Sequence, residues 1–115
     1  MPHFVLDCST DILQTQTDQH ILQQVHQVAA ASGLFVESDI KVRLNPFDTF
    51  VVGGKTQSFI HLFCHIMQGR TTEQKAQLSR AVVEKLVVLF PDIENIAMNV
   101  AEFEKATYCN RKSLL

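Results

Sequence analysis

Hydrophobic and polar residues alternate along four segments of the chain, and a period of two residues is typical of a strand with one buried face. The segments predicted as strands are 3–8, 39–44, 58–66 and 94–103. In the first segment, the apolar face carries Phe4, Leu6 and Cys8. In the second segment, Lys41 and Arg43 share the face opposite to Ile40, Val42 and Leu44. We expect Pro46 to end this second strand, because proline cannot donate to a strand ladder.

Between the first two strands, apolar residues follow a helical period. Thr17 or Asp18 caps a predicted helix that runs to about Ser32, and Gly33 supplies its C-terminal stop. The apolar stripe of this helix consists of Ile21, Leu22, Val25, Val28 and Ala29.

A second helix is predicted between the last two strands. Thr71 and Gln74 have the spacing of a capping box, and Pro91 stops the helix. Its apolar stripe consists of Leu78, Val82, Leu86 and Leu89. In the connections, we expect a short extended piece over 47–52, a turn at Gly53-Gly54 and a polar, irregular tail up to Leu115.

The order strand, helix, strand therefore occurs twice, with an offset of roughly 55 residues. Each helix is long enough to serve as the crossover between two parallel strands. The predicted fold is α/β (α+β): a four-stranded sheet with two helices on one face, in a single domain of residues 1–115 with halves of about 1–55 and 56–115. Phe59, Phe63 and Ile96 or their alternates leave apolar residues on the uncovered face. A second subunit is the expected cover for that face.

Composition narrows the class of protein. The chain has 115 residues and a formal net charge of −2, which argues against a general nucleic-acid binder. It has no apolar stretch of membrane-spanning length and no pattern of a signal peptide. The three cysteines form no CxxC motif, and we expect them to be small buried residues in a reducing, cytoplasmic protein.

His61 and His65 have the HxxxH spacing of a metal-binding pair on a helix. Here they fall in a predicted strand, where they would lie about 13 Å apart along the chain. We therefore expect no metal at these histidines.

Proline directly after the initiator methionine permits removal of Met1, which would leave the secondary amine of Pro2 at the chain start. Several further motifs occur along the chain in a fixed order: Pro2-His3-Phe4, Cys8-Ser9, Gly33-Leu34-Phe35, Ile40-Lys41-Val42-Arg43, Asp48-Thr49, Phe59-Ile60-His61 and Gly69-Arg70-Thr71. Together they resemble the 5-carboxymethyl-2-hydroxymuconate isomerases of the tautomerase superfamily, over nearly the whole chain.

The resemblance implies a duplicated β-α-β fold assembled as a homotrimer. It implies an isomerase of homoprotocatechuate degradation, a branch of aromatic compound catabolism, that moves a proton between an enol oxygen and a dienoate carbon without a cofactor. The partner would be a small carboxylate substrate, with neither nucleic acid nor membrane involved. The base in that family is the amine of the N-terminal proline, which corresponds to Pro2.

These residue types suit that chemistry. A general base works best with a pKa near the operating pH, and burial or nearby cations lower the pKa of an amine. Arginine holds carboxylates through two hydrogen bonds and keeps its charge when buried, so Arg43 and Arg70 are the expected catalytic partners of Pro2. Arg70 also sits at a helix N-terminus, where the helix dipole disfavours a cation, and this points to a functional role. An ion-paired strand arginine remains the alternative for Arg43.

Lys41 and Phe47 are the expected substrate-binding residues, and both lie where the chain departs from the family pattern. A charged surface residue is the alternative for Lys41. Lysine at position 41 replaces an arginine, and Asn45-Pro46-Phe47 replaces a more aromatic run. Two alternatives to the leading function remain open. One is a tautomerase of another enol, such as a phenylpyruvate-like compound, and the other is a trimeric interaction module without catalysis.

Overall fold

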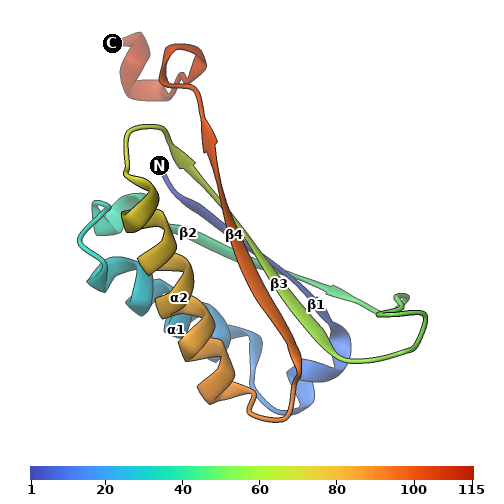
Figure 1. Ribbon diagram of the computed structural model, residues 1–115. Helices are drawn as coiled ribbons and strands as arrows, with labels where there is room; N and C mark the ends of the chain where they lie inside the picture. The colour runs from blue at the N-terminus through green and yellow to red at the C-terminus, as the bar shows by residue number, and fades with distance from the viewer.

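The computed structural model describes all 115 residues, and its regular elements are four strands and two long helices (Figure 1). The strands are β1 (His3–Ser9), β2 (Lys41–Phe47), β3 (Phe59–Met67) and β4 (Asn95–Phe103). The helices are α1 (Asp18–Ala31) and α2 (Thr72–Leu89). The predicted order of elements is confirmed.

The four strands form one sheet in the order β2-β1-β3-β4. β1 pairs with β2 in parallel, and β3 pairs with β4 in parallel. The two strands of each pair are connected by a crossover that contains one helix. The two halves meet where β1 pairs with β3, and this central pair is antiparallel. β1 and β3 therefore begin at opposite ends of the sheet.

Both helices cover the same face of the sheet, and the core lies between the two layers (Figure 1). The predicted apolar faces supply this core, since Phe4, Leu6 and Cys8 of β1 have no exposed surface. The core also includes Ile21, Val25 and Ala29 of α1, Ile60, Leu62, Cys64 and Ile66 of β3, and Leu78, Val82 and Leu86 of α2.

Both long helices begin at the threonine caps that the sequence predicts. The Thr17 side chain accepts a hydrogen bond from the amide of His20, three residues on. Thr71 and Gln74 form both hydrogen bonds of the predicted capping box, at 3.1 and 2.9 Å. A capping box satisfies amide groups that the first turn of a helix leaves unpaired.

The prediction that Pro46 ends β2 is wrong. The strand begins at Lys41, after a short 3-10 turn, and continues through Pro46 to Phe47, with Pro46 opposite Cys8 of β1. β2 is an edge strand with a single neighbour, and an edge position tolerates proline because alternate amides face away from the ladder.

The connections beyond the strands differ in part from expectation. The Gly53-Gly54 turn is confirmed, with φ angles of 59° and 79° that favour glycine, and Val52 and Lys55 bridge across it. The tail is not irregular, because it contains short 3-10 helices at Lys105–Thr107 and Arg111–Leu114.

The uncovered face of the sheet is mixed rather than apolar. Phe63 is 37% exposed there, but Ile96 packs on the core side. The ring of Phe63 lies beside His61, whose Nε2 is 2.6 Å from Asn99 Oδ1. The molecule measures 48 × 25 × 25 Å with a radius of gyration of 15.0 Å, against about 13 Å for a compact chain of this length. The β2–β3 connection and the tail extend beyond the sheet (Figure 1).

Neither α1 nor α2 has the length and apolar character that a bilayer crossing would demand.

Candidate active site

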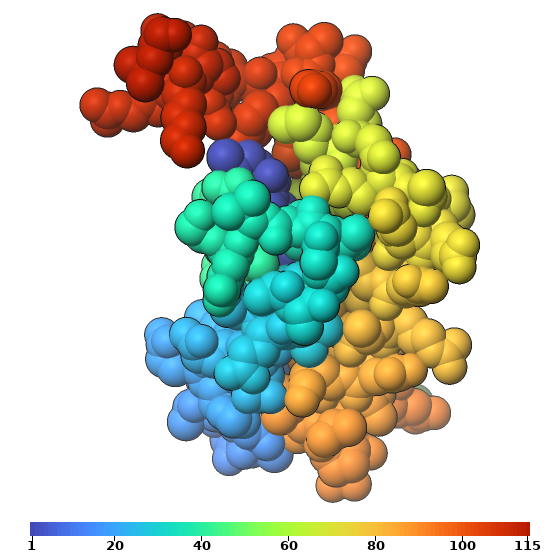
Figure 2. Space-filling view, turned by 90° about the vertical axis from the view of Figure 1, so that its left-hand side faces the viewer, coloured from blue at the N-terminus to red at the C-terminus, as the bar shows by residue number.

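Pro2 is buried at the start of β1. Its carbonyl oxygen accepts a hydrogen bond from the backbone amide of Lys41 at 3.1 Å, so the start of β2 fixes this residue in the sheet. Figure 2 shows the amino-terminal residues at the surface, between the segment around residue 40 and the β3–α2 connection and below the C-terminal tail. The start of the chain is thus held in place by the sheet, while the amino-terminal residue remains near solvent.

Charged groups from three parts of the chain act on the amino terminus. Burial and the positive charges of Arg70 and Lys41 lower the pKa of the Met1 amine, whereas the carboxylate of Asp39 raises it. The Lys41 ammonium donates to the Asp39 carbonyl oxygen at 2.7 Å and lies 3.9 Å from Met1 Sδ. Arg70 and Lys41, but not Arg43, are the cations next to the chain start.

Arg70 is held on the helix side of the sheet. Its Nη2 donates to the carbonyl oxygen of Leu34 at 2.5 Å, and its guanidinium lies 5.4 Å from the centre of the Phe35 ring. Phe35 in turn packs edge-on against Phe4 of β1, with ring centres 6.1 Å apart. The segment after α1 therefore fixes the direction of the Arg70 side chain.

Arg43 lies on the opposite, uncovered face of the sheet. Its Nη1 contacts Nδ1 of His3 at 3.1 Å across the β1–β2 pair. The shared face of Lys41 and Arg43 is confirmed by the burial pattern of β2, in which Val42 and Leu44 point inward. The two arginines predicted to flank Pro2 thus lie on different sides of the sheet.

Phe47 lies at the far end of β2. It pairs with Ser9, six residues beyond the His3–Lys41 pair, which corresponds to about 20 Å along the strand. Its side chain is 41% exposed. Within one chain, the structure does not bring Phe47 together with Pro2.

Sequence reasoning did not assign His3 or His65 to the site, and it considered His65 only as a metal ligand. These two residues pair directly across β1 and β3, and with Arg43 they line a cavity of about 410 Å³ on the uncovered face. Burial and the charges of Arg43, Lys41, His65 and the amino terminus lower the pKa of His3. The only signal in the sequence was the position of His3 directly after Pro2.

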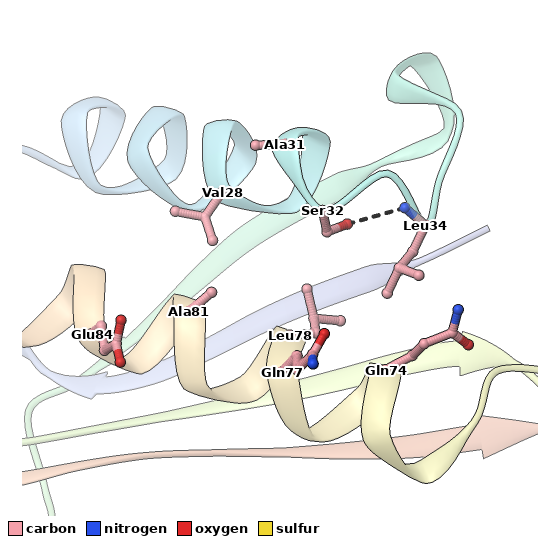
Figure 3. Close-up of a pocket in the computed structure, with 9 residues that line it drawn as sticks. All are labelled: Val28, Ala31, Ser32, Leu34, Gln74, Gln77, Leu78, Ala81 and Glu84. Atoms are coloured by element: carbon pink, nitrogen blue, oxygen red, sulfur yellow. Dashed lines mark hydrogen bonds between the residues drawn. The ribbon is translucent and has the colours of Figure 1, made fainter.

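A second hollow, of about 380 Å³, lies between α1 and α2 (Figure 3). Its apolar walls include Val28, Leu34 and Leu78. Its polar side chains already have partners, since Gln74 belongs to the capping box and Glu84 pairs with Arg80 at 3.0 Å. No cation lines this hollow, so it lacks the groups that would bind an anion.

The buried cysteines offer no nucleophile. Burial raises the pKa of Cys8 to about 11 and that of Cys64 to about 12, which keeps both thiols protonated at neutral pH. The prediction of buried cysteines is confirmed for these two and wrong for Cys109, which is exposed in the tail.

Residues 2–112 match the family model of 5-carboxymethyl-2-hydroxymuconate isomerase. The chain belongs to the 5-carboxymethyl-2-hydroxymuconate isomerase family. Membership in this family makes it an isomerase and confirms the resemblance seen in the ordered motifs.

Individual members of the 5-carboxymethyl-2-hydroxymuconate isomerase family are similar over most of the chain. The 5-carboxymethyl-2-hydroxymuconate Delta-isomerase of Escherichia coli is 26% identical over 106 residues, which cover 90% of this chain and 84% of that protein. The isomerase of this family from Deinococcus radiodurans R1 superposes with a TM-score of 0.82 at 22% identity, covering 96% of this chain and 88% of the other.

The fold extends beyond the family. The W0 fused 4-OT wild-type symmetric trimer superposes with a TM-score of 0.80 at 15% identity, covering 98% of this chain and 99% of that one. The predicted duplicated β-α-β tautomerase-like fold is confirmed.

Proposed function

We propose that this chain is a cofactor-independent isomerase that uses the amine of Pro2 as a general base on an anionic dienol of the 5-carboxymethyl-2-hydroxymuconate type. The observation that carries the proposal is the placement of Arg70 and Lys41 beside a chain start held in the sheet. Family membership and the Escherichia coli relative support the substrate type. Removal of Met1 is a requirement, because an amide nitrogen has no basic lone pair.

The surroundings suit an amine that must be unprotonated at neutral pH. Burial and the charges of Arg70 and Lys41 disfavour the protonated form of an amine at the chain start, as they do for Met1. A base whose pKa lies near the working pH takes up the proton of the enol hydroxyl and delivers a proton to carbon efficiently. The Pro2 nitrogen would transfer the proton from the dienol to the distal carbon.

The cations have separate proposed roles. Arg70, whose charge lowers the pKa of the Met1 amine, would also stabilise negative charge that develops on the substrate oxygen. Arg43 would bind a carboxylate from the uncovered side of the sheet, and Lys41 would contribute a further positive charge between the two. Phe47 would contact substrate only at the site of another copy, because it lies at the far end of β2.

We propose a homotrimer with its sites near the subunit boundaries. The uncovered sheet face and the two extensions beyond the sheet offer surface for neighbouring copies. The similarity to the fused 4-OT symmetric trimer supports this assembly. We further propose that residues 1–115 form one domain and that the protein is cytoplasmic, in keeping with its free, unpaired cysteines.

The test compares two forms of the same chain with 5-carboxymethyl-2-hydroxymuconate as substrate. Mass spectrometry first establishes that Met1 is absent from one form, and an N-terminal extension keeps Pro2 in a peptide bond in the other. We expect turnover in the processed form and almost none in the extended form. Equal turnover in both would exclude Pro2 as the base. A Pro2→Gly variant, which keeps a terminal but primary amine, should retain reduced activity.

A phenylpyruvate-like enol is the second candidate substrate. The stacked rings of Phe103 and Tyr108 favour it, because they give the cavity next to His3 an aromatic wall. Parallel assays of both compounds on the processed enzyme separate the two possibilities by their kcat/KM values.

A further inference from the structure

The connection between β3 and α2, residues 68–71, carries Arg70 and lies beside the chain start (Figure 2). The far end of the Arg70 side chain contacts Leu34 and Phe35, but its backbone follows a glycine. Gly69 has a φ of 122°, which side chains rarely allow, and the space where its side chain would begin is open. Packing around Gly69 therefore does not fix the backbone directly before Arg70. Contacts on either side of the glycine have to do so.

On the helix side of the glycine, the connection is tied to α2 and through it to the sheet. The capping box of Thr71 and Gln74 joins the connection to the first turn of the helix. Lys75, in that same turn, forms an ion pair of 3.0 Å with Glu102 near the end of β4. The two charged side chains are only 23% and 32% exposed.

On the strand side of the glycine, Gln68 makes two hydrogen bonds to the end of the chain. Its backbone amide donates to the carbonyl oxygen of Phe103 at 3.0 Å, one step beyond the last residue pair of β3 and β4. Its side-chain Oε1 accepts from the backbone amide of Lys105 at 2.7 Å. Lys105 is the first residue of the 3-10 turn Lys105–Thr107, so the Gln68 side chain joins the connection to the tail.

The hydrogen bond of the Gln68 side chain serves both partners. The first amides of a helical turn have no partner within the turn, and the glutamine carbonyl satisfies that of Lys105. The Gln68 side chain is exposed, so it adds nothing to the apolar core. Its single resolved contact is the one that holds the tail against the residue two positions before Arg70.

We propose that Gln68 is a positioning residue of the isomerase, whose side chain joins the tail to the β3–α2 connection and thereby fixes the place of Arg70 beside the chain start. The inference rests on the proposed function in one respect, the role that it gives to Arg70. A charged group in an active site has to be held to within a fraction of an ångström, and residues that do not touch substrate supply that support. A movement of the 3-10 turn would thus be passed on to Arg70.

The test breaks the same hydrogen bond from both sides. Gln68→Met keeps the length of the side chain and removes the acceptor. Lys105→Pro removes the donor, because proline has no amide hydrogen. The preceding residue, Glu104, is extended with a ψ of 126°, and proline suits the first position of a helical turn, so the backbone path is compatible with this change.

Each variant has a matched control. Lys105→Ala loses the same charge as Lys105→Pro but keeps the amide hydrogen. Gln23→Met makes the same replacement as Gln68→Met at an exposed glutamine of α1. Both controls should behave like the native protein.

We expect Gln68→Met and Lys105→Pro each to lower kcat by about two- to tenfold, the contribution of one neutral hydrogen bond, with little change in KM. The rising limb of kcat/KM should move to higher pH in both, because the charge of Arg70 is less well placed against the amine. The combined variant should lose no more than either one alone, since both changes remove the same bond. In an Arg70→Ala background, Gln68→Met should not move the limb further.

The position of Arg70 has a readout that needs neither substrate nor a free amine. The ring of Phe35 shifts the side-chain Nε–H resonance of Arg70 in proton–nitrogen NMR spectra, and the signal is assigned by its absence from Arg70→Ala. We expect this resonance to move in Gln68→Met and in Lys105→Pro and to stay in place in Lys105→Ala and Gln23→Met.

An unchanged Arg70 resonance in a folded Gln68→Met protein would overturn the inference. Equal effects of Lys105→Pro and Lys105→Ala, or fully additive losses in the combined variant, would overturn it as well. The NMR readout separates the inference from the proposed function. If the resonance moves as expected but the processed native protein isomerises no enol, the proposed function fails and the positioning contact stands. If the native protein is active and the resonance stays in place, only the positioning role of Gln68 fails.

Discussion

The guanidinium of Arg70 lies 5.4 Å from the centre of the Phe35 ring, and Phe35 in turn packs against Phe4 of β1. A cation–π contact contributes about 0.5–2 kcal/mol, depending on its exposure to solvent. Phe35→Leu should therefore lower kcat/KM for an anionic enol, by roughly two- to thirtyfold, while Phe35→Tyr should preserve it. The kinetics are compared at a temperature where denaturant curves show both variants folded. Equal losses in both variants would contradict a role for the ring face.

The two arginines should differ in their effect on the pH profile. Arg70 lowers the pKa of the Met1 amine, and we expect it to act in the same direction on the Pro2 amine of the processed chain. Arg70→Ala should therefore raise the pKa of the Pro2 amine and move the rising limb of kcat/KM to higher pH. Arg43 contacts His3 instead, so Arg43→Ala should weaken substrate binding and leave that limb in place. Each variant should lose about ten- to a hundredfold in kcat/KM, the usual effect of losing a charged hydrogen bond. A pH–rate series on the three processed enzymes measures both effects, and a limb that moves only in Arg43→Ala would reverse the assignment.

His3 should make stability depend on pH. Its pKa is lowered in the folded protein below the ordinary value of 6.5, so the unfolded chain binds more protons as the pH falls below that value. The stabilising contribution is complete above pH 6.5 and is lost as the pH falls through the folded pKa. Denaturant unfolding at pH 7.5 and at pH 5.5 should show a smaller pH effect in His3→Gln than in the native protein. An identical pH effect in the two proteins would show that His3 titrates normally.

The capping box of α2 should contribute measurably to stability. Thr71→Ala removes the side-chain acceptor for the Gln74 amide, and loss of such a cap typically costs about 0.5–2 kcal/mol. Thr72→Ala is the matched control, because this exposed threonine is the first residue of the helix and has no side-chain hydrogen bond. Urea unfolding of both variants measures the difference. A control that loses as much stability as Thr71→Ala would rule out the cap as the cause.

Assembly should depend on the uncovered face of the sheet. Sedimentation of the native protein should give about three times the chain mass of 13.0 kDa. Phe63→Lys places a charge on that face and should shift the protein towards monomer. Val88→Lys, at an apolar side chain that is 74% exposed on α2, should leave the mass unchanged. A native monomer at micromolar concentration would exclude the trimer.

The fold could be predicted from the sequence because each element carries a local signal. Alternation identified the strands, and Thr71 with Gln74 marked the start of α2 through contacts within one turn. The prediction that Pro46 ends the second strand was wrong because the effect of proline depends on whether the strand lies at the edge of the sheet. That position is a property of the whole topology. The prediction of an irregular tail was wrong because the 3-10 turns of the tail depend on contacts such as the stacking of Tyr108 on Phe103.

The candidate site could be predicted from the sequence less completely than the fold. The spacing of Lys41 and Arg43 predicted a shared face, and the structure confirms it. The contact between Arg43 and His3 depends on the register of β1 against β2, which no local pattern reports. The distance between Pro2 and Phe47 depends on that same register. The roles of Pro2, Arg43, Arg70, Lys41 and Phe47 remain predictions for the experiments above.

The antiparallel pairing of β1 with β3 has a consequence for the number of active centres. The two halves are similar in architecture, so the sheet has two equivalent corners, one where β1 begins and one where β3 begins. The second corner has no amine of its own, because β3 is entered through the peptide bond between Ser58 and Phe59. The second corner also has Asp11 and Asp48 in place of cations. Under the proposed function, a polypeptide that carries both halves supplies a single basic amine, so the proposed trimer would contain three reactive centres where six unlinked halves could have supplied six.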